Sequence, residues 1–329
     1  MYSFGCEGIK LTGNINIDLE DVAQSCNLYN GDSQAVIRAV DALKSKYDED
    51  ELVLIYNYML SKSQNPDVLM HLIRCCDEYR KSSTLEYLVD ILLLKNVSGC
   101  EDGLKEKFLN VRIMCAKAIG NMKDTNVVTS LLYCLNNKNE NYRVRLACAD
   151  ALGKIGDKYA VAPLIEVVKD ENEKSVYLKE GATVALGLLG DVRALDPLVS
   201  IIETKQGIMD KFSFLKERAI EALDKMGFGG NDRVFRALKS SLTDESPLVR
   251  IDAIEALMNS EHPQAFDTIK NVLENDSDDE VKKNALIALY NMSDREILDE
   301  VISSPKYSDT LKMAAVEIID EYESDGNDD

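Results

Sequence analysis

A helical pattern that recurs seven times constrains this 329-residue chain more than any other feature. Each copy begins with Val or Leu followed by Arg or Lys, and continues with small and large apolar residues in alternation. The anchors are Val111, Val144, Leu178, Leu215, Val249, Val281 and Leu311. Subtracting their numbers gives spacings of 33, 34, 37, 34, 32 and 30 residues. Periods of this length indicate stacked supersecondary units, each of which buries its apolar face only against its neighbours.

The small residues of the pattern predict how neighbouring helices pack. Counted from the anchor, the fourth residue is Cys or Ala in every copy, and the seventh is Ala in all but the last. Together with the aliphatic eighth residue, these positions lie on one face of a helix. Small side chains allow a close approach between helices, and large ones fill the grooves. We therefore predict an all-α solenoid of about nine helical pairs, in which a large residue at Ala185 or Ala256 costs roughly 1–3 kcal/mol.

The pattern also divides the chain into regions of different regularity. Its strength and its interruptions predict an irregular lead-in with one short helix (1–32), atypical helical pairs (33–96), an insertion (97–108), seven regular repeats (109–322) and a disordered acidic tail (323–329). Asp18 is expected to cap the short helix and Gly31 to end it. The helices of the atypical pairs are expected at 34–46, 51–62, 67–79 and 84–95. A smaller insertion falls near 204–213.

Turn residues punctuate the regular repeats. The pairs Gly156-Asp157 and Gly190-Asp191 are expected to end one helix and to cap the next. Pro163 and Pro197 occupy equivalent places in the partner helices, past the first turn of the expected helix, where proline should produce a kink.

A basic residue follows the anchor in all seven repeats. These residues are Arg112, Arg145, Lys179, Lys216, Arg250, Lys282 and Lys312. A cation near the N-terminus of its own helix opposes the macrodipole, so helix propensity does not explain them. Acidic residues stand shortly before most of them, which favours a structural ladder of ion pairs that joins one repeat to the next. The alternative, a basic stripe for an anionic ligand, is disfavoured by the surplus of nearby acid.

Overall composition excludes several classes of function. The chain has 38 basic and 58 acidic residues and a net charge of −20, which repels phosphate backbones and argues against nucleic-acid binding. The same charge would steer a basic partner towards the protein; the simpler interpretation is that the acidic residues solvate a long surface. No apolar run is long enough for a membrane span, and the first residues lack a secretory signal. The eight cysteines form no C-x-x-C pair and several fall in helical apolar patterns, so we expect a reducing, cytoplasmic location.

A protein-binding surface is expected where the repeated helices turn away from their packed seam. Polar residues would normally occupy those positions in a solvated helix, whereas the middle repeats are apolar there and the later repeats acidic. The residues expected on this concave surface are Ile113, Leu146, Val184, Leu188, Glu217, Glu221, Asp252 and Glu255. A contiguous apolar patch on a protein surface often marks an interaction site. The alternative is that the twist of the superhelix buries these side chains against the insertion.

The string Val-Arg-x-x-Ala-x-x-Ala-Leu-Gly-x-Ile-Gly-Asp, followed by Ala-x-x-Pro-Leu-Ile, resembles HEAT repeats of the phycobilisome-lyase-like type. The resemblance is strongest at 142–170 and 177–203, is good over 109–322, and is weak before residue 96. It implies a right-handed α-solenoid in which the Val-Arg helices line the concave face. Relatives of this type include bilin lyase subunits, deoxyhypusine hydroxylase and scaffolds without catalytic activity.

Metal and cofactor chemistry is not expected from the sequence. The resemblance to deoxyhypusine hydroxylase would imply a di-iron site built from His-Glu dipeptides, and this chain has none. Its two histidines, His71 and His262, and its scattered cysteines show no zinc-ligand spacing. We therefore predict a non-catalytic scaffold or adaptor, without metal or cofactor, that binds a protein with a basic surface. The alternatives are a lyase-like or chaperone-like accessory to covalent attachment of a bilin-type cofactor and, remotely, a deoxyhypusine-hydroxylase-like monooxygenase.

Overall fold

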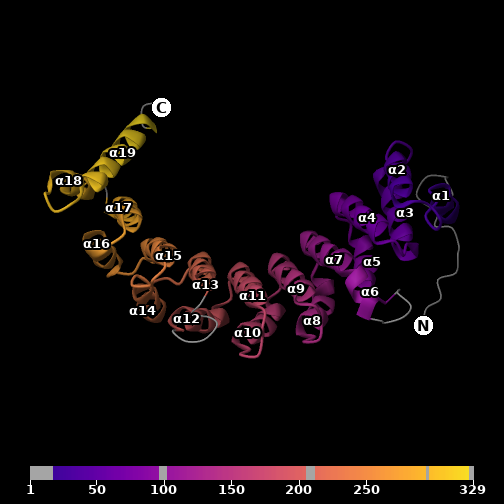
Figure 1. The fold of residues 1–329 in the computed structure, drawn as a ribbon, viewed down its shortest axis with the longest axis horizontal. Helices are drawn as coiled ribbons and strands as arrows, with labels where there is room; N and C mark the ends of the chain where they lie inside the picture. The colour runs from indigo at the N-terminus through magenta and orange to yellow at the C-terminus, as the bar shows by residue number, and fades with distance from the viewer. Residues whose placement is uncertain (1–17, 96–101, 205–211, 294–295, 326–329) are drawn as a thin grey trace. The chain divides into compact units, whose positions relative to one another are not determined.

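The computed structural model describes residues 18–95, 102–204, 212–293 and 296–325, and the regular elements in these ranges are all helices. Figure 1 shows the helices following one another as antiparallel pairs. The chain forms two compact units, Met1–Ala160 and Val161–Asp329. The prediction of an all-α solenoid is confirmed.

Unit 1 is a stack of two layers of helices. Its α-helices are α1 Leu19–Ser25, α2 Ser33–Leu43, α3 Glu49–Lys62, α4 Pro66–Tyr79, α5 Leu85–Leu92, α6 Asp102–Lys107, α7 Leu109–Met122, α8 Val128–Asn136 and α9 Tyr142–Ile155. Short 3₁₀ helices, η1 Ser82–Thr84, η2 Thr125–Val127 and η3 Lys158–Ala160, precede or follow them. Helices α2, α4, α7 and α9 lie side by side in one layer, and α3, α5 and α8 pack against them (Figure 1).

Unit 2 repeats the same arrangement. Its helices are α10 Val161–Lys169, α11 Val176–Leu189, η4 Val192–Ala194, α12 Leu195–Glu203, α13 Ser213–Met226, α14 Asp232–Ser241, α15 Pro247–Met258, α16 Ala265–Asn275, α17 Asp279–Ser293, α18 Glu296–Ser303 and α19 Asp309–Asp325. Helices α11, α13, α15, α17 and α19 form one layer, and each packs against its partner among α10, α12, α14, α16 and α18 (Figure 1). In both units we call the layer that contains the repeated pattern the inner layer and the other the outer layer.

The inner helices meet through the small residues of the pattern. Gly120 on α7 lies so close to α9 that a Cβ built on it would be 2.8 Å from the Cα of Ala151. Gly187 on α11 faces α13 in the same way, and its Cβ would lie 2.8 Å from the Cβ of Ala222. Ala185 and Ala256 are also buried. Close backbone approach therefore fixes the spacing of the inner helices in each unit.

Three predicted helix ends need correction. Asp18 caps α1, because its side chain accepts the amide protons of Glu20 and Asp21. The helix ends at Ser25, six residues before Gly31, since Asn27 adopts a left-handed conformation (φ 54°) and turns the chain there. Asparagine tolerates this region better than most residues. Helices α2 to α5 lie where the atypical pairs were predicted, although α2 and α5 end at Leu43 and Leu92, three residues before the predicted ends.

The glycine and proline positions give one confirmation and one correction. Gly156 and Gly190 end α9 and α11 with φ values of 82° and 60°, and the Asp191 side chain caps η4. Pro163 and Pro197 are each the third residue of an α-helix, because a 3₁₀ turn precedes α10 and α12. The first four amide groups of a helix have no partner within it, so proline is tolerated there. The predicted kink past the first turn is therefore wrong in its position.

The less regular regions are described only in part. Within the predicted insertion, Asp102–Lys107 form α6, and at the C-terminus α19 continues to Asp325, three residues into the predicted tail. The start of the lead-in (1–17), residues 96–101, most of the smaller insertion (205–211) and the end of the tail (326–329) lie outside the described residues. The sequence-based domain limits remain predictions.

Candidate functional site

Each basic residue of the repeat is the fourth residue of its inner helix. Five of them are buried although charged: Arg112, Arg145, Lys179, Lys216 and Arg250. Lys282 and Lys312 are half-buried, and within the described ranges neither forms an ion pair. A buried cation needs compensating partners, so these five buried basic residues are expected to make specific contacts with other protein groups.

In unit 1 and at the start of unit 2 these side chains reach the ends of outer helices. The Nε of Arg112 donates to the carbonyl oxygen of Leu92 at 2.8 Å, and that residue is the last of α5. Arg145 Nε donates to the carbonyl of Leu135 in α8 at 2.8 Å, and Lys179 Nζ donates to that of Val168 in α10 at 3.1 Å. The carbonyl end of a helix attracts cations. The recurring cation therefore stabilises the C-terminus of the preceding outer helix, and this contact offsets its unfavourable place in its own helix.

Arg112 also forms a buried ion pair. Its two terminal nitrogens donate to the two carboxylate oxygens of Glu140 at 3.0 and 2.6 Å. Burial alone would raise the pKa of Glu140, but hydrogen bonds from Arg112 and from the Asn141 amide outweigh it and lower this pKa. A bidentate pair of this kind is stronger and more directional than a single contact. It joins α7 to the loop that precedes α9.

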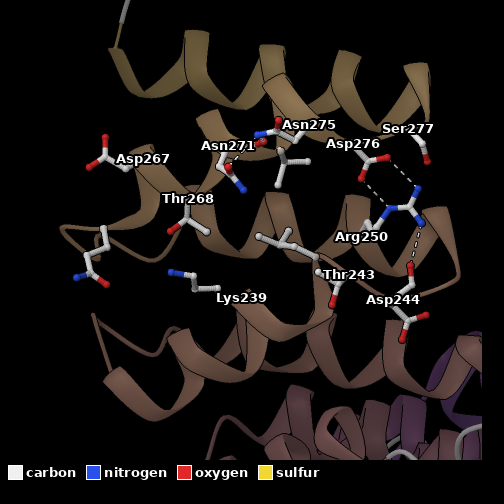
Figure 2. Close-up of a pocket in the computed structure, with 13 residues that line it drawn as sticks. Lys239, Thr243, Asp244, Arg250, Asp267, Thr268, Asn271, Asn275, Asp276 and Ser277 are labelled. Carbon is white, nitrogen blue, oxygen red and sulfur yellow. Dashed lines mark hydrogen bonds and ion pairs between the residues drawn. The ribbon is translucent and has the colours of Figure 1, made fainter.

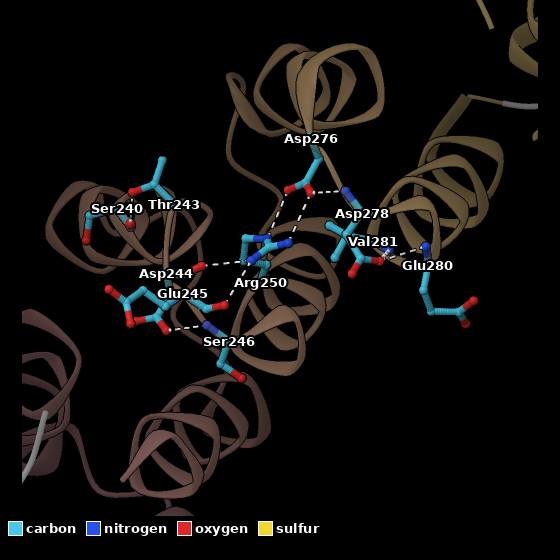
Figure 3. Close-up of polar contacts among 10 residues, drawn as sticks. All are labelled: Ser240, Thr243, Asp244, Glu245, Ser246, Arg250, Asp276, Asp278, Glu280 and Val281. Carbon is cyan, nitrogen blue, oxygen red and sulfur yellow. Dashed lines mark hydrogen bonds and ion pairs between the residues drawn. The ribbon is translucent and has the colours of Figure 1, made fainter. Parts of the chain in front are cut away.

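The same connection recurs in unit 2. Lys216 Nζ lies 2.8 Å from Asp244, in the loop before α15. Arg250 Nε lies 2.9 Å from Asp276, and one terminal nitrogen of Arg250 donates to the Asp244 carbonyl at 2.8 Å (Figure 3). Asp276 also accepts the amide of Asp278, which in turn caps α17. These buried residues are occupied with protein groups, so they offer no basic stripe to an anionic ligand.

The predicted apolar contact residues differ in exposure. Ile113 on α7 and Leu146 on α9 are half-buried in unit 1. In unit 2, Val184 is half-buried and Leu188, one turn later on α11, is 52% exposed. Of these four, Leu188 therefore offers the largest fraction of its surface to a partner.

An aromatic pair that sequence reasoning missed lies on the same helix. Tyr177, at the start of α11, is 60% exposed and stacks on Phe214 of α13, with ring centroids 6.2 Å apart. Phe212 meets Phe214 edge to face at 5.4 Å. Tyr177 precedes Val184 and Leu188 by seven and eleven residues, a spacing that places all three on one side of α11. The signal in the sequence was an aromatic residue directly before two successive anchors.

The four predicted acidic residues lie on the adjacent helices α13 and α15. We call Glu217, Glu221, Asp252 and Glu255 the acidic cluster. Burial raises the pKa of Asp252 to about 6, and the charges of Glu217, Glu221 and Glu255 contribute to the rise. Arg218 forms an ion pair with Glu221 at 2.8 Å and counters only part of this charge. Glu217, which was predicted to lie on the surface, is buried, whereas Glu255 is exposed.

A separate polar groove lies in the outer layer of unit 2. It has a volume of about 710 Å³ between α14 and α16, and Figure 2 shows its wall, which includes Lys239, Thr268, Asn271 and Asn275. The Asn275 amide nitrogen donates to the backbone and side-chain oxygens of Asn271 at 3.0 and 2.9 Å. Arg250 lines the groove and is held by Asp276. Much of this polar lining is thus paired internally, which makes the groove a weaker candidate than the inner helices.

One histidine and one cysteine, which show no zinc-ligand spacing in the sequence, lie close to an aspartate in the structure. Asp41, His71 and Cys75 come together in unit 1, and their ligand atoms lie within 4.8 Å of one another. The place of Asp41 could not be predicted from the sequence, because it stands thirty residues before His71 and is brought to it by the packing of α2 on α4. The six cysteines described are all buried free thiols.

Stacked pairs of helices in two layers define the class of α-solenoid repeat proteins. The sequence pattern of HEAT repeats matches residues 97–177, 139–211 and 210–290, which together span 97–290. The chain therefore belongs to the HEAT-repeat family, and the resemblance noted in the sequence is confirmed at that level. No curated protein sequence matches it.

Several solved structures are similar in fold. YibA of E. coli is 15% identical over 87% of this chain and 96% of its own length, with a TM-score of 0.51. The karyopherin Kap121p is 13% identical over 91% of this chain but only 37% of its own, with a TM-score of 0.51. The complex of CpcE and CpcF of phycocyanin lyase from Nostoc sp. PCC7120 is 19% identical over 72% of this chain and 87% of that one, with a TM-score of 0.43. For YibA and Kap121p, identities this low show a likeness of fold alone.

The described helices were also compared with the requirements of a membrane span. None of those in the described ranges is both long enough and apolar enough to cross a bilayer.

Proposed function

We propose that this protein is a non-catalytic HEAT-repeat scaffold that binds a protein partner with a basic surface. The binding site is the side of the inner layer of unit 2 that faces away from the outer layer, formed by α11, α13 and α15. We call this side the open face. The observation that supports this proposal is the exposed Tyr177, stacked on the half-buried Phe214, beside an acidic cluster that is only partly neutralised.

The two parts of the open face suit different contributions to binding. Exposed aromatic and aliphatic side chains such as Tyr177 and Leu188 supply buried apolar area, and aromatic residues are enriched among those that dominate binding energy. The acidic cluster supplies orientation and a faster encounter with a cationic partner. Leu248, at the start of α15, is 59% exposed and extends the apolar row.

The state of Asp252 gives a further reason to expect a cationic partner. Burial and neighbours of like charge make the ionised form of this carboxyl group less favourable, as its raised pKa reflects. A lysine or arginine from a partner would favour the charged form and remove the repulsion. Binding would then lower the pKa of Asp252, and the cation of the partner would compensate the negative charge of the acidic cluster.

The experiment compares two charge-matched variants in affinity capture from lysate of the source cell. The captured proteins are identified by mass spectrometry, and each is then purified so that its affinity for both variants can be measured. The open-face variant combines Glu217→Gln, Glu221→Gln, Asp252→Asn and Glu255→Gln. The control variant removes the same number of charges from exposed sites outside the inner layer, by Glu166→Gln, Glu203→Gln, Glu261→Gln and Asp267→Asn. Tyr177→Ala and Leu188→Asp test the apolar part.

We expect the partner to be retained by the control variant and lost or weakened at least about tenfold by each open-face variant, a change of 1.4 kcal/mol. Circular dichroism and melting should be nearly unchanged for Tyr177→Ala and Leu188→Asp, because both side chains are largely exposed. Equal partner binding by the open-face and control variants would contradict the proposed site. Weakening of both by the same factor would point to long-range charge alone.

The proposal includes a reducing, cytoplasmic location, which the free buried thiols support. An accessory role in attaching a bilin-type cofactor is the competing function, and an absorbance spectrum of the purified protein separates the two. A visible chromophore band would favour the accessory role.

A further inference from the structure

Three metal-ligating side chains meet in unit 1, away from the proposed protein-binding site. His71 and Cys75 are one turn apart on α4, so both project from the same side of that helix. Asp41 comes from α2, the neighbouring helix of the inner layer. Among the described residues this is the one group of three such side chains whose ligand atoms converge.

The distances are close to those of a tetrahedral metal site. The Sγ of Cys75 lies 3.7 Å from the Nε2 of His71, and the Oδ1 of Asp41 lies 2.8 Å from the same Nε2. Zinc with bonds of about 2.0 Å to nitrogen and oxygen and 2.3 Å to sulfur separates N from S by about 3.6 Å and N from O by about 3.3 Å. The first distance already fits. The second requires Asp41 to retreat by about 0.5 Å, which an exposed side chain on a single helix can do by a small rotation.

The group is open to solvent on the side of Asp41 and His71 and buried on the side of Cys75. The Asp41 and His71 side chains are 52% and 16% exposed, so an ion can enter from solvent, whereas Cys75 is buried. On α3, which packs against α4, the hydroxyl of the wholly buried Tyr56 has no hydrogen-bond partner among the described groups.

We propose that Asp41, His71 and Cys75 bind a zinc ion through three protein ligands, leaving a fourth position open. A thiolate and an imidazole select zinc over magnesium or calcium, which prefer oxygen ligands alone. On binding, the Cys75 thiol loses its proton to solvent and sulfur bonds to the metal. A proton on Nε2 of His71 moves to Nδ1, so that Nε2 can bind the metal as a neutral imidazole.

The second histidine of the chain provides an internal control. His262 also lies near an aspartate, with Nε2 3.2 Å from Asp232, thirty residues earlier. Its ring stacks on Phe235 at 3.7 Å, and its Nδ1 accepts the amide proton of Gln264. No cysteine joins this group, since all six described cysteines belong to unit 1. His262→Gln therefore removes a histidine–aspartate pair without touching the proposed site.

The test uses the full chain, freed of metal and kept reduced with a phosphine, and titrates it with Co²⁺ as a spectroscopic substitute for Zn²⁺. We expect one Co²⁺ per chain, with a thiolate-to-cobalt charge-transfer band that zinc abolishes by displacement. Cys75→Ser should remove the band. Asp41→Asn and His71→Gln should weaken binding by more than about tenfold, since even the loss of an outer-shell partner costs that much. His262→Gln and Cys76→Ala should retain both band and affinity.

Two outcomes would overturn the proposal. One is the absence of the band in the wild-type chain, and the other is an equally strong band in Cys75→Ser, which would assign the sulfur ligand elsewhere. Asp41→Asn distinguishes loss of a metal ligand from loss of the fold. Because Asp41 is half-exposed, this variant should have the same melting temperature as the wild type in the absence of metal. At equal zinc concentration, the melting temperature of the wild type should rise more than that of Asp41→Asn.

Discussion

Replacing Asp252 with asparagine should stabilise the protein above pH 6 and have no effect below pH 4. The folded-state pKa of Asp252 is about 6, against 3.8 for a free side chain. The difference of 2.2 units corresponds to about 3 kcal/mol at 1.36 kcal/mol per unit. Asp252 is only half-buried, so solvent screening reduces this, and about 1.5 kcal/mol is the expected effect.

The sign follows from proton binding. Because its pKa is raised on folding, Asp252 binds more protons in the folded than in the unfolded state between pH 4 and 6, so its contribution to stability falls as pH rises through that window. Asparagine has the same shape and does not titrate. The variant should therefore lack this loss, while other groups affect both proteins alike.

The assay is denaturant unfolding of both proteins at pH 4, 5, 6 and 8. At pH 8 the variant should be more stable by about 1.5 kcal/mol, or about 3–6 °C in melting temperature for a unit of this size. Asp267→Asn, an exposed carboxylate on α16, serves as the control and should show no such dependence. A stability difference for Asp252→Asn that is the same at pH 4 and pH 8 would refute the reasoning.

Two further perturbations test the packing. Arg112→Met leaves the buried Glu140 carboxylate without its partner and should cost about 3–5 kcal/mol in denaturant unfolding, whereas Arg193→Met, at a half-exposed pair, should cost less than about 1 kcal/mol. Equal losses would mean that burial of the pair does not matter. Gly187→Ala should cost about 1–3 kcal/mol because its Cβ meets α13 at 2.8 Å, and melting measures this against Gly103→Ala, which has open space around it and should be neutral or slightly stabilising. A neutral Gly187→Ala would show that α11 and α13 can separate without loss.

The sequence predicted the helices of the repeat well because their information is local. Each helix of the repeat contains its own signals: the anchor, the small residues and the glycine that ends it. Gly156 and Gly190 end their helices as expected. Boundaries failed where two signals competed. Gly31 looked like the end of the first helix, yet Asn27 could adopt the left-handed conformation sooner.

The contacts of the site were less predictable because they join residues distant in sequence. The sequence predicted ion pairs for the basic residues such as Arg112 but not the backbone carbonyl that Arg112 also contacts, since that carbonyl belongs to α5. Tyr177 and Phe214 are 37 residues apart, and their stacking depends on how α11 and α13 are placed. His71 and Cys75 are one helical turn apart, but no rule of ligand spacing would select Asp41, which lies thirty residues before His71.

The reach of Arg112 bears on how such a chain can gain or lose length. The residue contacts Leu92, twenty positions earlier, and Glu140, 28 positions later, so its contacts extend beyond a single 33-residue period. Lys216 and Asp244 are again 28 positions apart. A deletion or duplication of one whole period brings an equivalent acid and an equivalent carbonyl back into register. A deletion of any other length leaves a buried guanidinium without its partners. Recombination between copies of this chain should therefore give folded products when the crossover joins equivalent positions, and unstable products when it does not.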